Sequence, residues 1–230
     1  MKRHILKGLI SALLALFGLS VFAAVAQATT YYVSPTGNDT AAGTSVTTPW
    51  KTFDRSWQSL YPGDTLIVMD GVYYQSLNPD TRNGEPGKPI TIRAQHDGKA
   101  IIDGEHVRMT VKIGDTWPGP IGEYFVIEGI VARNSSDSVW FLRGDHNILR
   151  RVSGYNASTD TNDHVFLVWA NDNLIEDCLC VWHWPQHDAH LSKASAIRSG
   201  AVSRPGRSGM DAISVGDMAK RQQSGNLQCK

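Results

Sequence analysis

The sequence predicts an all-β protein whose short strands stack as the coils of a parallel β-helix, which is a solenoid. Three observations predict this class. Brief β-prone runs follow one another from residue 31 to residue 181, no convincing helix occurs in that span after residue 60, and two segments recur at one spacing. Parallel strands without crossover helices leave a solenoid as the main option.

The first 28 residues are expected to be a Sec-type signal peptide. Lys2, Arg3 and Lys7 supply a positive start, residues 9–25 are mostly apolar, and Ala26-Gln27-Ala28 is a small-x-small cleavage site. The alternative is a membrane anchor, but a run of about 17 apolar residues is at the short limit for spanning a bilayer. We therefore expect a bacterial protein that is secreted or periplasmic and has no membrane contact after cleavage.

One helix is expected before the coils, at residues 52–60. Phe53, Trp57 and Leu60 fall on one apolar face at this spacing, and Pro62-Gly63 would end the helix. After it, the β-prone runs are separated by Gly, Asn, Asp and Pro, which are turn residues.

An internal repeat is the strongest signal in the chain. Residues 139–142 recur as residues 165–168, and residues 146–152 recur as residues 172–178, both at an offset of 26. An earlier copy at residues 125–130 lies 22 residues before the middle one. Unequal spacing fits stacked coils whose loops vary in length.

Aligning the copies places similar residues in columns. The columns are Val126, Ile148 and Leu174; Ile127, Leu149 and Ile175; Ile130, Val152 and Cys178; and Glu128, Arg150 and Glu176. Because neighbouring coils lie about 4.8 Å apart, the acid–base–acid column is attractive and is expected to form an outward charge ladder. Asn147 and Asn173 are expected to hydrogen-bond up the stack, a structural role that we prefer to a catalytic one.

Five segments of the chain resemble the start of secreted right-handed parallel β-helix proteins of the pectin-lyase-like type. They are residues 31–39 (YYVSPTGND), 49–53 (PWKTF), 62–73 (PGDTLIVMDGVY), 87–94 (GKPITIRA) and 100–104 (AIIDG). The resemblance implies a β-helix domain over residues 29–181, with an N-terminal cap at about 31–62 and coils at about 63–181. It also implies that the helix at residues 52–60 caps the open end of the stack.

The same resemblance implies an acidic polysaccharide as partner, because many such proteins bind or cleave one. Chondroitinase B-like and alginate-lyase-like enzymes are the nearest kind. A lyase neutralises a uronate carboxylate, by Ca²⁺ or Arg, and a base then removes the neighbouring proton. The candidates are Arg151 and His164 for catalysis, Arg150 and Trp169 for substrate binding, and Asp163, Glu176 and Asp177 as oxygen ligands for Ca²⁺. The alternative is that these residues form only the charge ladder and a solvated surface.

The charge balance argues against one class of partner, and the spacing of two cysteines argues against a disulfide. Residues 29–181 hold 12 basic and 19 acidic residues, whereas a nucleic-acid binder needs a basic face, so we expect no nucleic-acid partner. Cys178 and Cys180 lie two apart on an expected strand and are interpreted as buried small apolar residues rather than a disulfide.

Residues 182–230 are expected to be an irregular tail with the opposite charge, 7 basic against 3 acidic residues. It is either a disordered tail or the product of a reading-frame shift near residue 182, which would truncate the solenoid after about five coils. The rival functions are a non-catalytic cell-surface or glycan-binding module and an inactive truncated fragment. The sequence leaves the oligomeric state open.

Overall fold

The computed structural model describes residues 27–79, 82–114, 122–158, 164–168, 170–182, 190–198 and 213–214. The expected signal peptide lies almost entirely outside these residues, and so do the candidate site residues Asp163 and Trp169. Among the described residues, no helix is both long and apolar enough to cross a membrane.

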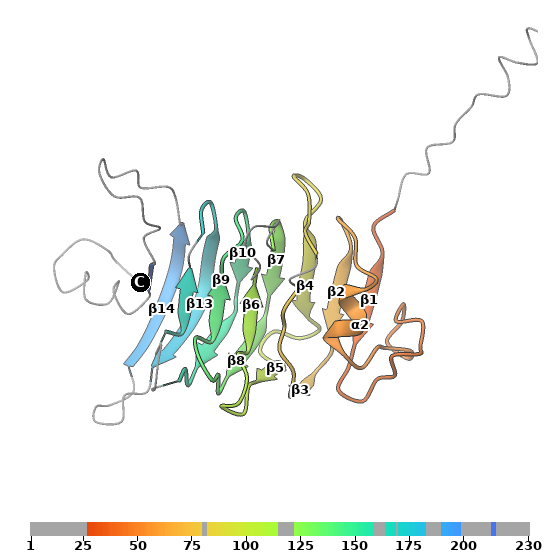
Figure 1. Ribbon diagram of the computed structural model, residues 1–230, viewed down its shortest axis with the longest axis horizontal. Helices are drawn as coiled ribbons and strands as arrows, with labels where there is room; N and C mark the ends of the chain where they lie inside the picture. The colour runs from red at the N-terminus through yellow and green to blue at the C-terminus, as the bar shows by residue number, and fades with distance from the viewer. Residues whose placement is uncertain are drawn as a thin grey trace, which may run out of the picture.

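The chain winds into coils whose strands stack in three parallel ladders (Figure 1). The first ladder contains β1 (Thr30–Val33), β2 (Thr65–Val68), β4 (Ile90–Ala94), β7 (Phe125–Glu128), β10 (Ile148–Arg150) and the first half of β13 (Leu174–Trp182). The second contains β3 (Gly71–Tyr73), β5 (Ala100–Asp103), β8 (Ile130–Arg133), β11 (Ser153–Tyr155) and the second half of β13. The third contains β6 (Val111–Ile113), β9 (Trp140–Leu142) and β12 (Phe166–Val168). This is the right-handed parallel β-helix that the sequence predicts.

The strand registers confirm the predicted columns. Ile148 pairs with Val126 on one side and Leu174 on the other, and Arg150 pairs with Glu128 and Glu176. In the third ladder Trp140 pairs with Phe166, as the offset of 26 requires. Each pairing is parallel, so successive coils lie directly on one another.

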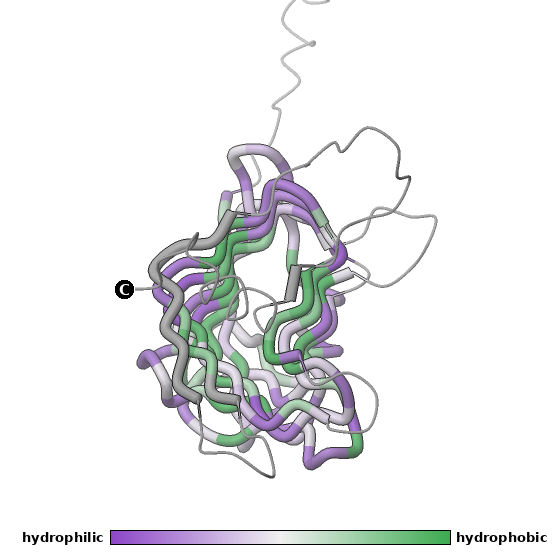
Figure 2. The backbone as a smooth tube through the Cα atoms, turned by 90° about the vertical axis from the view of Figure 1, so that its left-hand side faces the viewer, coloured by the Kyte–Doolittle hydropathy of each residue, from purple (hydrophilic) through white to green (hydrophobic). Residues whose placement is uncertain are grey.

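The ladders enclose a single apolar core. In the first ladder Leu66, Ile92, Ile127, Leu149 and Ile175 occupy one inward column and are all buried. Figure 2, which looks along the stack, shows hydrophobic strand segments and hydrophilic corners superposed from coil to coil. Alternation along each strand therefore directs apolar side chains inward and polar ones outward.

The corners between ladders contain residues whose backbone adopts the left-handed conformation, with positive φ. Nine non-glycine residues among those described have positive φ, a conformation that L-residues adopt rarely, and all of them lie at corners. Three corner columns contain most of them. Gly129, Arg151 and Asp177 lie between the first and second ladders, Asn134 and Asn156 follow the second, and Tyr124, His146 and Asp172 precede the first. We call these the first, second and third corners, in that order.

Two buried asparagines form hydrogen bonds with the backbone at the start of the first-ladder strands. Asn147 accepts the N–H of Phe125 at 2.8 Å and donates to the carbonyls of Gly122 and Gly144 at 2.9 and 2.8 Å. The N–H of Asn147 donates in turn to Oδ1 of Asn173 at 2.7 Å. Both asparagine side chains are buried, so the predicted structural role for the pair is confirmed.

The N-terminal helix is shorter than expected. Helix α2 covers Phe53–Trp57 rather than residues 52–60, and Thr52 caps it by accepting the N–H of Arg55 at 3.1 Å. Phe53, Trp57 and Leu60 are nevertheless all buried in the main core, at the β1 end of the stack. Turn residues follow Trp57, so the apolar spacing extends beyond the helix itself.

The sequence predicts an irregular tail, but the structure places two strands in it, one of nine residues and one of two. β14 (His190–Arg198) pairs antiparallel with β13, and β15 (Ile213–Ser214) pairs antiparallel with β12. The edge strand β13 would otherwise present unpaired backbone N–H and C=O groups, and an added strand satisfies them. No parallel coil follows β13 among the described residues.

Cys178 and Cys180 are free thiols that are both buried, as predicted. Burial raises the pKa of Cys178 to about 11 and that of Cys180 to about 12. A thiol with such a pKa carries almost no thiolate near neutrality and reacts slowly.

We expect Asn147→Ala to lower the free energy of unfolding by about 3 kcal/mol, because it leaves buried backbone groups without partners. Denaturant titration followed by circular dichroism measures this loss. Asn171→Ala, at an exposed position two residues before Asn173, is the matched control and should change stability by less than about 0.5 kcal/mol. Equal stability of Asn147→Ala and wild type would contradict the asparagine ladder.

We also expect Cys178 and Cys180 to resist alkylation in the folded protein and to react on unfolding. A Cys229→Ser background isolates these two thiols, and iodoacetamide labelling with and without denaturant, read by mass spectrometry, tests the expectation. Rapid labelling of both thiols in the native state would show that β13 is not packed against the core.

Candidate functional site

The first corner brings together four of the predicted site residues. Arg150 and Arg151 come from the end of β10 and the turn after it, and Glu176 and Asp177 lie one coil further along in β13. A left-handed residue makes the turn in each coil, with φ of 50° at Arg151 and 53° at Asp177. Their side chains therefore leave the coil at the same edge.

The equivalent position on the preceding coil has to be glycine. Gly129 has φ of 70°, and a Cβ placed on it would lie 2.2 Å from Oδ1 of Asp97. The carboxylate of Asp97 therefore sits directly against the backbone of the next coil. This close approach places Asp97 beside the corner residues of later coils.

Arg150 is held between two carboxylates. Its guanidinium forms an ion pair with Glu176, and its Nη1 lies 3.7 Å from Oε1 of Glu128. All three side chains are partly exposed, at 37% for Arg150, 28% for Glu176 and 20% for Glu128. The predicted outward acid–base–acid ladder is confirmed.

Arg151 reaches back across two coils. Its Nε donates to Oδ2 of Asp97 at 2.7 Å, and its Nη2 lies 3.6 Å from Oε2 of Glu128. The hydrogen bond to Asp97, with smaller contributions from the charges of Glu128 and Asp177, raises the pKa of Arg151. Arg151 thus ties three coils together at their surface.

The balance of charge at this corner favours cohesion over anion binding. Two guanidinium groups face the carboxylates of Asp97, Glu128, Glu176 and Asp177, so acidic groups exceed basic ones. A uronate carboxylate would have to displace one of these partners to reach either arginine.

The described residues do not fit a Ca²⁺ site at this corner. Calcium needs six to eight oxygen ligands, and Glu176 is already engaged by Arg150. Within the described part of the chain, no group of three His, Cys, Asp or Glu side chains could hold a metal ion. Asp163, the third predicted ligand, lies outside that part.

His164 lies on the third ladder, away from the arginines. Its carbonyl accepts the N–H of Val139 at 3.1 Å, which places it just before β12. The Nδ1 atom of His164 is buried and has no hydrogen-bond partner among the described residues. Among the described contacts none joins His164 to Arg150 or Arg151, so the predicted catalytic pair is not brought together there.

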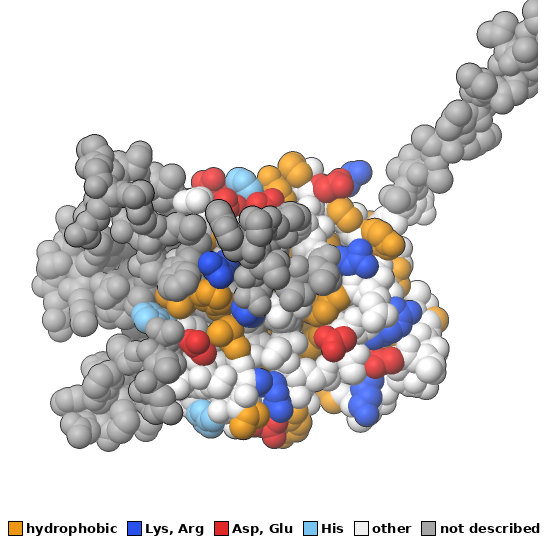
Figure 3. All heavy atoms as spheres, viewed as in Figure 1, with side chains coloured by type: hydrophobic (Ala, Val, Ile, Leu, Met, Phe, Trp, Pro, Cys, Tyr) orange, Lys and Arg blue, Asp and Glu red, His pale blue; other side chains and the backbone are white. Residues whose placement is uncertain are grey.

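The third ladder carries cationic residues that the sequence reading did not single out. Lys112 on β6 pairs with Phe141 on β9, so both occupy one outward position on neighbouring coils. Arg143 follows β9, and its guanidinium carbon lies 6.0 Å from the centroid of the Phe141 ring. Figure 3 shows Lys and Arg side chains beside hydrophobic ones on the face that carries β6 and β9. The spacing between Val111 and Trp140 is 29, which differs from the repeat offset and concealed this coil.

A polar network occupies the second corner. Arg133 donates from Nε to Oδ2 of Asp103 at 2.7 Å and from Nη1 to the hydroxyl of Tyr155 at 3.2 Å. Burial alone would raise the pKa of Asp103, but hydrogen bonds from the Glu105 N–H, Asn134 and Arg133 outweigh it, and the pKa is lowered. These side chains satisfy one another across three coils, which is a structural role.

Comparison with known proteins matches this architecture. No family model matches the chain. Among curated proteins it is 34% identical over 76 residues to the uncharacterized protein YwoF of Bacillus subtilis, covering 33% of this chain and 16% of that protein. It is 24% identical over 135 residues to pectate lyase L of Dickeya dadantii (54% and 30% covered) and 34% identical over 77 residues to pectate lyase PEL9 of Emericella nidulans (33% and 18% covered). The chain therefore spans less than a third of the length of each of these relatives.

A solved structure shares the fold. The crystal structure of pectate lyase Pel9A superposes with a TM-score of 0.50 at 18% identity, over 67% of this chain and 40% of that one. Together with the parallel ladders, this similarity shows that the chain has the right-handed parallel β-helix fold that the structure of Pel9A shares.

Proposed function

We propose that this chain binds an acidic polysaccharide along the outer face of its third ladder. Lys112 and Arg143 would contact the carboxylates of the polymer. The observation that carries the proposal is the placement of these two cations on neighbouring coils, with Lys112 opposite Phe141 and Arg143 over the ring of Phe141. The similarity to two proteins named as pectate lyases supports a polyuronate as the ligand.

The geometry suits a polymer because the solenoid repeats its surface. Successive coils are about 4.8 Å apart, so cations on neighbouring coils can meet successive carboxylates of one extended chain. The ring of Phe141 is only 8% exposed and lies under the guanidinium of Arg143. A cation–π contact of this kind restricts the arginine and reduces the entropy lost when it binds an anion.

Cleavage by β-elimination is the finer form of the proposal. The cations would stabilise the negative charge that develops on the uronate when the neighbouring proton leaves. His164, which is half-buried on this ladder, is the candidate base, and its Nε2 would accept the proton because its Nδ1 is buried. Export of the chain, carried by residues 1–28, belongs to the proposal as well, because a polysaccharide of this kind lies outside the cell.

A non-catalytic glycan-binding module is the second candidate. It is favoured by the ion pairs of the first corner, which engage Arg150 with Glu176 and Arg151 with Asp97. A binding module needs the cations and the extended surface but no base or metal ion. The first corner, including Arg150 and Arg151, would then serve only to hold the coils together.

Both candidates predict binding of polygalacturonate or alginate that depends on Lys112 and Arg143. The double variant Lys112→Gln/Arg143→Gln should weaken binding roughly tenfold or more, because each charge-assisted contact contributes a few kcal/mol at most. Isothermal titration with polyuronate oligosaccharides measures the change. Arg93→Gln, which removes an exposed arginine from the outer face of the first ladder, should leave binding unchanged.

Ultraviolet absorbance of unsaturated products, recorded on alginate, chondroitin and pectin with and without Ca²⁺, separates a lyase from a binder. Binding without absorbance change would establish the module. Unchanged affinity of the double variant would show that the third ladder is not the binding face.

A further inference from the structure

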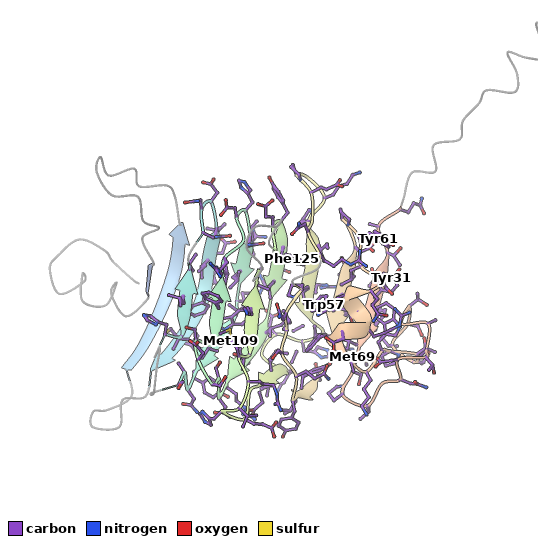
Figure 4. The ribbon with its side chains drawn as sticks, viewed as in Figure 1. Tyr31, Trp57, Tyr61, Met69, Met109 and Phe125 are labelled. Atoms are coloured by element: carbon purple, nitrogen blue, oxygen red, sulfur yellow. The ribbon has the colours of Figure 1, made fainter. Side chains whose placement is uncertain are left out.

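The end of the stack that carries α2 presents an aromatic side chain to solvent. Tyr61 is 60% exposed, in the turn between α2 and β2 (Figure 4). Tyr74 is the other strongly exposed tyrosine among the described residues, at 57%. Single exposed aromatic residues are ordinary, so any function of Tyr61 has to rest on its surroundings.

A cation is fixed over the ring of Tyr61. The guanidinium carbon of Arg82 lies 5.2 Å from the ring centroid. Arg82 donates from Nε to the carbonyl of Trp57 and from Nη2 to the carbonyl of Gln58 at 3.0 Å. These carbonyls lie at the end of α2, so the helix holds the guanidinium against the ring. Within the described residues these two bonds use only part of its five N–H donors.

The backbone beneath Tyr61 is also fixed. Its N–H donates to Oδ2 of Asp64 at 2.9 Å, and the N–H of Asp64 donates back to the carbonyl of Tyr61 at 3.0 Å. Asp64 is buried, with 5% of its surface exposed, and also accepts the N–H of Thr29 at 2.7 Å. The ring therefore projects from a rigid turn and needs little ordering to bind a ligand.

A second cation lies close to this turn. Gly63 has φ of 95°, and a Cβ placed on it would lie 3.9 Å from the Cβ of Lys88. Lys88 is exposed and belongs to a tight hairpin with Glu85, whose N–H donates to the Lys88 carbonyl at 3.1 Å. Arg82 thus lies against Tyr61 itself, and the Cβ of Lys88 lies beside Gly63, two residues further along the same turn.

From this arrangement we infer a sugar-binding subsite at Tyr61, in which the ring face opposite Arg82 stacks on the apolar face of a uronate residue and Arg82 contacts a carboxylate of the polymer at the ring edge. An exposed aromatic face packs against the C–H groups of a sugar, and a planar guanidinium matches a carboxylate. The inference rests on the proposed function, because it names this end of the solenoid as a further contact for the same acidic polymer. Figure 3 shows Lys and Arg side chains on the face over β6 and β9 and also near the end that carries α2, on the same side of the molecule.

Tyr61→Ala should weaken binding of long polyuronate oligosaccharides roughly three- to tenfold. Tyr61→Phe keeps the ring and should bind as wild type. Tyr74→Ala removes a tyrosine of matching exposure, over which no cation lies among the described residues, and should also bind as wild type. Isothermal titration with polygalacturonate and alginate oligosaccharides of increasing length, with a neutral glucan as the uncharged reference, provides the readout. Circular dichroism confirms that each variant is folded.

Wild-type affinity of Tyr61→Ala for every polyuronate would overturn the subsite and leave the proposed function standing. An equal loss in Tyr74→Ala would also overturn it, because the effect would then not depend on the site. Absence of polyuronate binding by the wild-type chain would instead refute the proposed function, and the subsite with it. Equal loss of affinity for the neutral glucan would contradict the role assigned to Arg82.

Discussion

Each coil of this chain lies at hydrogen-bonding distance from the next, and the register does not shift along the stack. A side chain therefore has its counterparts directly above and below, about 4.8 Å away, and must be compatible with both. Aliphatic residues meet this condition in the inward column from Leu66 to Ile175. On the outside, Arg150 meets it because its neighbours are Glu128 and Glu176 rather than further arginines.

Turning the chain at every corner has a cost in conformational free energy, and contacts between coils offset it. A left-handed conformation costs an ordinary residue about 1–2 kcal/mol, and residues such as Arg151, Asp177 and Asn134 adopt it. Interactions between coils compensate at the same places. Arg151 binds Asp97, Asn156 donates to Asn134 at 2.9 Å, and the rings of Tyr124 and His146 stack at 4.8 Å. The surface charges are thus committed largely to holding coils together, which explains why the arginines with the clearest sequence signal are poor candidates for ligand contact.

Sequence reasoning recovered the coils whose spacing is regular. The offsets of 22 and 26 located the strands containing Val126, Ile148 and Leu174, because a column in a solenoid leaves a repeated pattern in the sequence. Sequence reasoning missed β6, because the spacing from β6 to β9 differs from the repeat offset and a strand of three residues is too short to show a hydrophobic periodicity. Lys112 and Arg143 were missed with it.

The pairing of β14 could not be read from the sequence, because antiparallel addition to an edge strand leaves no column to detect. Within the site, charge alternation predicted that Arg150 and Glu176 meet. It could not say whether such an arginine serves a ligand or a neighbouring coil, since that depends on contacts with Glu128 and Asp97 from other coils.

Disulfide cross-linking between outward positions of the first ladder tests the parallel stacking most directly. A disulfide needs Cα atoms roughly 4.4–6.8 Å apart, which positions on adjacent coils satisfy and positions two coils apart do not. In a background lacking the native cysteines, Ile148→Cys/Leu174→Cys should form a bond on mild oxidation, seen by mass spectrometry. Val126→Cys/Leu174→Cys should remain reduced. A bond in the second pair, or none in the first, would contradict the coil order on which the fold, the corner network and the proposed binding face all rest.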